Sequence, residues 1–164
     1  MKRTFAVAAV AFGAVLVGSL AHAAPSGQIL GPEGFDGLKL GMSVPDAYQT
    51  TLLHVYQGED PGAGVNPACS KFEFRAAPNV LRVLISPTKG VAVIDAYPGV
   101  RTPRGIGIGS SRKDLVAAYP EWSEGPNGRW VPVPGNANAT YAIDVQDDKV
   151  IHIGLYQNGQ DCSE

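Results

Sequence analysis

The sequence predicts an α+β protein built as a tandem repeat, in which each half is a short helix followed by an antiparallel meander. Two observations carry this prediction. The phrase GLKLGMSVPDA at 37–47 returns at 105–115 as GIGIGSSRKDL. After each phrase the apolar periodicity changes from helical to alternating, which is typical of a helix followed by half-buried strands. We therefore expect one α/β repeat over 24–98 and a second over 99–164.

Residues 1–23 have the composition of a secretory signal peptide. Lys2 and Arg3 are followed by an apolar run and then by the small-residue motif AHA, the order typical of a signal peptide with its cleavage site. The apolar run is shorter than the roughly 20 residues that a membrane-spanning helix needs. We therefore expect cleavage after Ala23, a secreted location, and no membrane insertion once the signal peptide is removed.

The charge of the mature chain argues against nucleic acid as a partner. Without Lys2 and Arg3, 11 of the 13 basic residues remain against 15 acidic ones, so the net charge is negative. Nucleic-acid-binding proteins carry a basic patch or stripe, whereas the lysines and arginines of this sequence are scattered. We expect no nucleic-acid partner, and no motif in the sequence indicates a cofactor.

Cys69 and Cys162 are the two cysteines of the sequence. In an oxidising compartment two thiols pair, so we expect one disulfide between them. It would close a long loop, for which chain entropy gives a stabilisation of about 4–5 kcal/mol. No metal site is expected, because two thiols, His54 and His152 offer too few ligands.

Each copy of the repeated phrase is expected to begin a helix. Ser43 and Ser111 stand at the same place in the two copies, three residues before Asp46 and Asp114. In a capping box, the serine side chain accepts a hydrogen bond from the backbone N–H three residues on, and an acidic residue in the first turn is favourable. A phosphate-binding loop is the rival interpretation, but the glycine spacing of GIGIGSS fits neither the dinucleotide fingerprint nor the P-loop.

The residues after each cap continue as a short helix and then alternate. Val44, Tyr48 and Leu52 lie on one helical stripe in the first half, and Pro120 ends the helix of the second half. Alternating apolar residues then predict strands within 72–74, 80–85 and 91–97, and again near Trp130 and within 140–145 and 150–156.

The doubled pattern of Leu-Gly-Met-Ser and Ile-Gly-Ser-Ser, each followed by a short helix and a meander, resembles the actinobacterial secreted β-lactamase-inhibitory-protein-like fold. The same module is similar to the small outer-membrane assembly lipoproteins of the SmpA and OmlA type. The resemblance implies a tandem repeat in which helices pack on one face of a curved sheet, while the other face meets a protein partner. It implies either inhibition of a β-lactamase or binding of another extracellular or envelope protein, and we favour the second.

An extracellular hydrolase that uses serine and histidine is the alternative function. Only His54 and His152 remain after signal removal, so one of them would have to be the base. Ser110 and Ser111 are the best-placed serines, but no Gly-x-Ser-x-Gly elbow surrounds them, and capping already explains Ser111. No catalytic residue is therefore assigned.

The strand at 150–156 decides where His152 points. Strict alternation puts Ile151, Ile153 and Leu155 on one face of this strand. His152 then lies on the other face together with Tyr156, in the position of a solvated strand histidine.

The binding surface is expected on the sheet face away from the helices, at Tyr97, Trp130, His152 and Tyr156. Tyr97 and Tyr156 each follow the first valine of the last strand of their half by six residues, so both are expected to project from that face. Trp130 fits this surface or a position packed between the repeats. Because aromatic side chains are common hot spots, the sequence favours a secreted, non-enzymatic protein-binding module, with a structural envelope protein as a third class.

Overall fold

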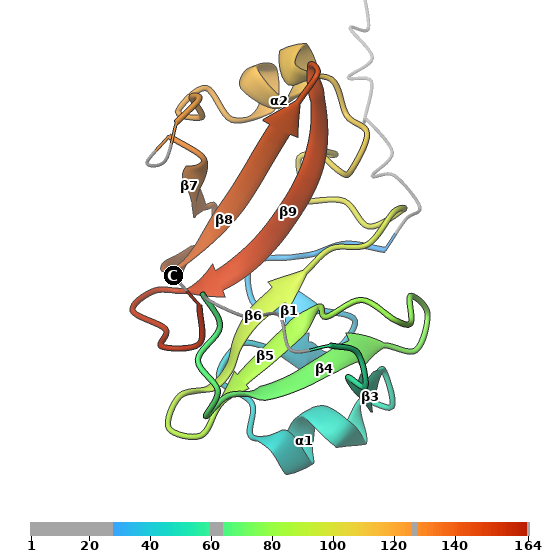
Figure 1. Ribbon diagram of the computed structural model, residues 1–164. Coiled ribbons are helices and arrows are strands. Elements are labelled where there is room, and N and C mark those ends of the chain that lie inside the picture. Colours follow the sequence, from blue (N-terminus) through green and yellow to red (C-terminus); the bar gives the residue numbers. More distant parts are fainter. Residues whose placement is uncertain (1–27, 60–63, 126–127, 164) are drawn as a thin grey trace, which may run out of the picture.

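The computed structural model describes residues 28–59, 64–125 and 128–163, and its main element is a seven-stranded antiparallel sheet (Figure 1). In order across the sheet the strands are β3 (Leu53–Val55), β4 (Ser70–Phe74), β5 (Val83–Ser86), β6 (Gly90–Asp95), β9 (Lys149–Gln157), β8 (Asn136–Gln146) and β7 (Trp130–Val133). A hairpin of β1 (Gly34–Phe35) and β2 (Leu38–Lys39) precedes them in the chain. The pairing of β6 with β9 joins the strands of the two halves of the chain.

One face of the sheet carries the main hydrophobic core. Alternating strand residues contribute to it, among them Phe72 and Phe74 of β4 and Leu155 of β9, as expected for strands with one buried face. Residues from the β1–β2 hairpin with its flanking segments, 30–42, and from the irregular segment 97–106 belong to the same core. These segments, rather than a layer of helices, therefore complete the packing on this face.

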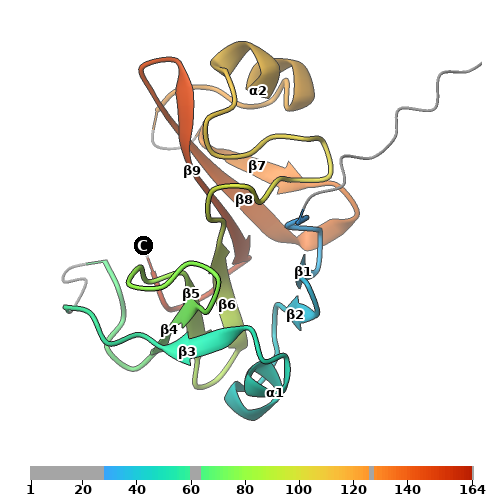
Figure 2. The same cartoon turned by 90° about the vertical axis from the view of Figure 1, so that its right-hand side faces the viewer.

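The predicted α+β class, with helices packed on one face of the sheet, is wrong, because the protein is mostly β. The described residues hold two short helices, α1 (Val44–Gln49) and α2 (Arg112–Ala118), and each buries one residue, Ala47 or Leu115. The two helices lie at opposite ends of the molecule (Figures 1 and 2). They do not form the helical layer that the resemblance implied.

Both helices end after less than two turns. Thr51 has a φ of 60° directly beyond the C-cap of α1, and Pro120 follows the C-cap of α2. A residue in the left-handed region and a proline each stop helix propagation. Helices this short bury too little apolar surface to cover the sheet, which is why loop segments fill the core instead.

The two copies of the repeated phrase have the same local structure. Ser43 Oγ accepts a hydrogen bond from the backbone N–H of Asp46 at 3.3 Å, and Ser111 Oγ accepts one from Asp114 at 3.1 Å. Each serine hydroxyl also donates to the aspartate carboxylate at 2.6 Å. Both serines therefore cap their helices as the spacing predicts, and each cap contributes about 1 kcal/mol.

Each phrase is also attached to a sheet strand by the same pair of backbone hydrogen bonds. The N–H of Gly41 donates to the carbonyl of Val91, and the N–H of Val91 donates to Met42. In the second copy the N–H of Gly109 donates to Val150, whose own N–H donates to Ser110. Two segments far apart in the chain thus use one local arrangement.

The predicted disulfide is confirmed. Cys69 and Cys162 are bonded, with their Cα atoms 5.7 Å apart and a separation of 93 positions in the sequence. The C-terminal segment runs beside the segment that precedes β4 (Figure 1). Both cysteines are buried with Leu84, Ala92 and Val93 in a second, smaller core, so the disulfide fixes a cover over part of the second sheet face.

The described residues contain no helix that is long and apolar enough to cross a membrane.

Candidate functional site

The sheet face opposite the main core is buried over the first half of the chain and half-buried over the second. Residues 64–69 and 160–163, which the Cys69–Cys162 disulfide joins and which we call the disulfide segment, cover Leu84 and Val93. The half-buried part carries charged and aromatic side chains from β6, β7, β8 and β9 and from the residue before β7. We call this surface the open face, and it consists of Asp95, Arg129, Trp130, Asp144, His152 and Tyr156.

A β-bulge lies directly before His152 in β9. His152 is paired with Asp144 and Val150 with Val145, so Ile151 is the extra residue of β9. Ile151 is 50% exposed, and the prediction that it shares the buried face of Ile153 is wrong because a bulge interrupts the alternation. From His152 onward the alternation holds as predicted, with Ile153 in the main core.

The same bulge occurs in the first half of the sheet with different chemistry. Leu84 is paired with Val93 and Ile85 with Val91, so Ala92 is the extra residue. Leu84 and Val93 are apolar and buried, where the second half has Asp144 and His152. The bulge therefore forms without a charged pair, and the carboxylate and imidazole are not needed for this backbone geometry.

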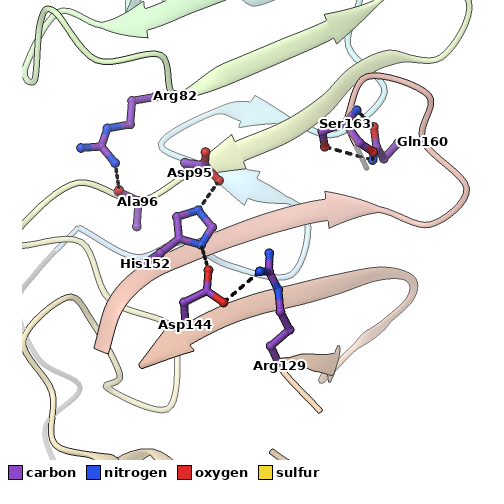
Figure 3. Close-up of polar contacts among 8 residues, drawn as sticks. All are labelled: Arg82, Asp95, Ala96, Arg129, Asp144, His152, Gln160 and Ser163. Carbon is purple, nitrogen blue, oxygen red and sulfur yellow. Dashed lines mark hydrogen bonds and ion pairs between the residues drawn. The ribbon is translucent and has the colours of Figure 1, made fainter. Parts of the chain in front are cut away.

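His152 lies between two carboxylates (Figure 3). Its Nε2 is 3.0 Å from Oδ1 of Asp95, and its Nδ1 is 3.3 Å from Oδ2 of Asp144. Arg129 Nη1 lies 3.0 Å from the other oxygen of Asp144. Nδ1 of His152 is at ion-pair distance, but it has no well-aligned hydrogen-bond partner among the described residues. Three strands and the residue before β7 thus bring together a chain of alternating charge.

A glycine makes this close approach possible. Gly154 is paired with Asp95 across β6 and β9. A Cβ atom at this position would lie well under 3.0 Å from Oδ1 of Asp95 and Cε2 of Tyr156, and 3.3 Å from Cε1 of His152. The carboxylate, the imidazole and the phenol ring therefore meet directly above the backbone of Gly154.

The surroundings change the ionisation of two side chains on the open face. Burial of His152 lowers its pKa, but the hydrogen bond to Asp95 and the negative charges of Asp95 and Asp144 outweigh burial and raise the pKa above its ordinary value. Burial and the negative charge of Asp95 raise the pKa of Tyr156 far above its ordinary value. Tyr156 is therefore a neutral phenol at physiological pH.

Two aromatic rings form the less polar part of the open face. The rings of Trp130 and Tyr156 meet edge to face, with centroids 5.0 Å apart and planes at 90°. The guanidinium of Arg129 lies 5.0 Å from the Trp130 ring centroid, a distance at which a cation–π contact is favourable. Both rings are half-buried, so they are held in place and still present surface.

The structure brings together three of the four predicted binding residues, and Tyr97 is not among them. Tyr97 is buried in the main core, where its ring packs against Phe35 and Phe74 and its hydroxyl donates to Gln28 at 2.7 Å. The expectation that it projects beside Tyr156 is wrong. β6 ends at Asp95, so strand alternation no longer applies two residues later.

Sequence reasoning missed Asp95, Asp144 and Arg129. A signal for the two aspartates was present, because each follows an isoleucine in a predicted strand, Ile94 or Ile143. Both isoleucines are in the main core, so alternation places both aspartates on the opposite face. That the two carboxylates lie on either side of one histidine depends on the pairing of β6, β9 and β8, which local sequence does not contain.

A cavity of about 340 Å³ adjoins the open face. It is lined in part by Trp122, Glu124, Arg129 and Asp144. The indole N–H of Trp122 donates to the carbonyl of Ile143 at 2.9 Å, which fixes one wall. The cavity gives space beside the Arg129–Asp144 ion pair for a side chain from another molecule.

Among the described residues, His54 and His152 have partners other than the predicted serines. Both ring nitrogens of His152 face carboxylates, and His54 is exposed and contacts Arg75. Ser111 caps α2, and Ser110 Oγ accepts a hydrogen bond from the N–H of Gly107 at 3.0 Å. The predicted serines are thus engaged with backbone groups near α2.

One grouping within the described residues has the spacing of metal ligands, Cys69, Asp161 and Cys162. Its two sulfur atoms are bonded to each other, and a disulfide does not supply the thiolates that bind metal. The resemblance to the β-lactamase-inhibitory-protein-like family stays a prediction. No family model, no curated protein and no solved structure matches the chain.

Proposed function

We propose that the mature chain is a secreted, non-enzymatic protein that binds another extracellular or envelope protein through the open face. The observation that carries this proposal is the ordered pair of Trp130 and Tyr156 beside the charges of Arg129, Asp144 and His152. Tryptophan, tyrosine and arginine are the side chains most enriched at binding hot spots.

The open face is preorganised, which favours binding. Trp130 is held between Arg129 and Tyr156, so few rotamers remain to be fixed when a partner binds. Ordering a free side chain at an interface costs about 0.5–1.5 kcal/mol. The charged groups already neutralise one another, so a partner covers paired charges rather than isolated ones.

A secreted location is supported by two features. The N-terminal sequence, which lies outside the described residues, has the composition of a signal peptide for export, and the Cys69–Cys162 disulfide is of the kind that persists outside the reducing cytosol. The disulfide segment also covers the first half of the sheet face, which leaves the open face as the available surface.

The hydrolase alternative receives less support. A general base needs a ring nitrogen within reach of the nucleophile, whereas a carboxylate oxygen lies 3.0 Å from one ring nitrogen of His152 and 3.3 Å from the other. Aspartates on both sides of the imidazole favour the doubly protonated ring, which has no lone pair with which to accept a proton.

Comparative affinity capture tests the proposed function. The disulfide-bonded mature chain is immobilised through an N-terminal tag and exposed to secreted and envelope fractions of the producing organism. The wild-type chain is compared with the double variant Trp130→Ala/Tyr156→Ala. Tyr48→Ala is the matched control, because Tyr48 is 40% exposed and belongs to α1 at the other end of the molecule.

We expect a protein that the wild-type chain and Tyr48→Ala retain and that the double variant loses, with its affinity weakened by more than about 2 kcal/mol. Circular dichroism and intact mass establish that the double variant is folded and oxidised. Equal retention by a folded double variant would show that the open face is not the binding surface.

A further inference from the structure

The geometry around His152 favours one protonation state of the ring. Both ring nitrogens lie at 3.0–3.3 Å from a carboxylate oxygen. A neutral imidazole has one N–H and one lone pair, whereas the imidazolium has an N–H at both nitrogens. Only the protonated ring interacts favourably with Asp95 and Asp144 at the same time.

The charges that face His152 come from every neighbouring element of the open face. They are Asp95 on β6, Asp144 on β8, and Arg129 before β7, while the phenol of Tyr156 lies beyond Gly154 on the same strand. Arg82, opposite Asp95, is held by the carbonyl of Ala96 at 2.8 Å. With His152 protonated, the two aspartates are balanced by His152 and Arg129. Deprotonation leaves one carboxylate facing a lone pair.

Contacts connect His152 to both aromatic rings. On one side Asp144 pairs with Arg129, whose guanidinium lies over the ring of Trp130. On the other side Asp95 and the ring of Tyr156 approach each other above Gly154. Movement of either carboxylate therefore disturbs one of the two rings.

We propose that His152 is a proton-operated switch of the open face: its doubly protonated ring holds Asp95 and Asp144 in the binding arrangement, and loss of a proton lets a carboxylate move away from the ring, so that Asp144 displaces its partner Arg129 and the Trp130 ring and partner binding weakens. The inference rests on the proposed function of this face. The apolar pair Leu84 and Val93 at the equivalent bulge supports it, because the fold forms there without a titrating group. Despite the opposing effect of burial, the carboxylates raise the pKa of His152 above its ordinary value, and histidine is the side chain whose ordinary pKa lies nearest physiological pH.

Nuclear magnetic resonance of the isolated chain tests the switch without a partner. The ring resonances of His152 and the indole N–H of Trp130 are followed from about pH 5 to about pH 8, the range in which histidine titrates. We expect the Trp130 signal to shift with the same midpoint as His152. His152→Gln should abolish this shift, and His54→Gln, the matched control, should leave it unchanged.

Binding to the captured protein is then measured across the same range. Above the pKa of His152, the binding-competent fraction falls tenfold for each pH unit, so the apparent Kd should rise by up to about tenfold per unit. In His152→Gln this pH dependence should disappear. The switch would be overturned if the Trp130 signal did not change as His152 titrates. It would also be overturned if the Kd were the same below and above the midpoint of the His152 titration.

The two proposals fail in different ways. If capture depends on Trp130 and Tyr156 but not on pH, the proposed function is supported and the switch is refuted. If the Trp130 signal follows the titration of His152 but no protein is captured at acidic or alkaline pH, the proposed function is refuted. The coupling of the open face to His152 is then still supported.

Discussion

Gly154→Ala should disrupt the open face through a single methyl group. The new Cβ would lie well under 3.0 Å from Oδ1 of Asp95 and from Cε2 of Tyr156. Gly154 does not have a positive φ, so alanine suffers no backbone strain, and the effect comes from crowding alone.

The magnitude of the effect follows from these contacts. Non-bonded carbon atoms are best separated by about 3.5–4.0 Å, so the Asp95 carboxylate has to move by on the order of 1 Å. Its Oδ1 is 3.0 Å from Nε2 of His152, and such a movement breaks this hydrogen bond. Overpacking costs about 1–3 kcal/mol, and a hydrogen bond to a charged group contributes about 1.5–3 kcal/mol. The same movement of Asp95 relieves the overpacking and breaks the hydrogen bond, so the two costs do not add. We therefore expect the free energy of unfolding to fall by about 2 kcal/mol.

Two assays measure this loss. Chemical denaturation should give a lower free energy of unfolding, and thermal unfolding a Tm lower by about 6 °C. The pKa of His152, followed by its ring resonances, should fall because the hydrogen bond to Asp95 that raises it is lost. In an Asp95→Ala background the cost of Gly154→Ala should shrink, since the two changes share a contact. Unchanged stability and an unchanged His152 pKa in Gly154→Ala would refute the proposed packing.

Three further predictions concern the disulfide, the histidine and the cap. The exported protein should have the mass of a chain that begins at Ala24 with two hydrogens missing, and replacing both cysteines by serine should lower the free energy of unfolding by about 4–5 kcal/mol; free thiols in folded protein would contradict this. Because the pKa of His152 is raised in the folded state, protonation of His152 stabilises the fold fully below the ordinary histidine pKa, and this stabilisation is lost as pH rises through the folded-state pKa. The difference in free energy of unfolding between wild type and His152→Gln should therefore shrink from acidic to alkaline pH. A constant or growing difference would argue against this role of His152. Ser111→Ala should cost about 1 kcal/mol and Ser111→Gly only a few tenths, with partner capture retained by both; loss of a hydrolytic activity without loss of stability would favour the enzyme alternative.

Local features of the fold could be predicted from the sequence because they depend on neighbouring residues or on simple counting. Ser43 and Ser111 cap helices through a backbone N–H three residues away, which is a local interaction. The disulfide followed from there being two cysteines. Alternation correctly placed His152 and Ile153 on opposite faces, because both follow the bulge in a regular stretch of β9.

The tertiary structure alone decided the remainder. The small share of helix in the fold depended on how early α1 and α2 end and on which loop segments cover the core. Both depend on which distant segments of the chain pack against the sheet. Tyr97 entered the core because β6 ends before it, and Ile151 became exposed because a bulge shifts the register. The chain of Asp95, His152, Asp144 and Arg129 depends on β9 lying between β6 and β8. Strand pairing is selected by the packing of the whole sheet, so no local pattern in the sequence could place these four side chains together.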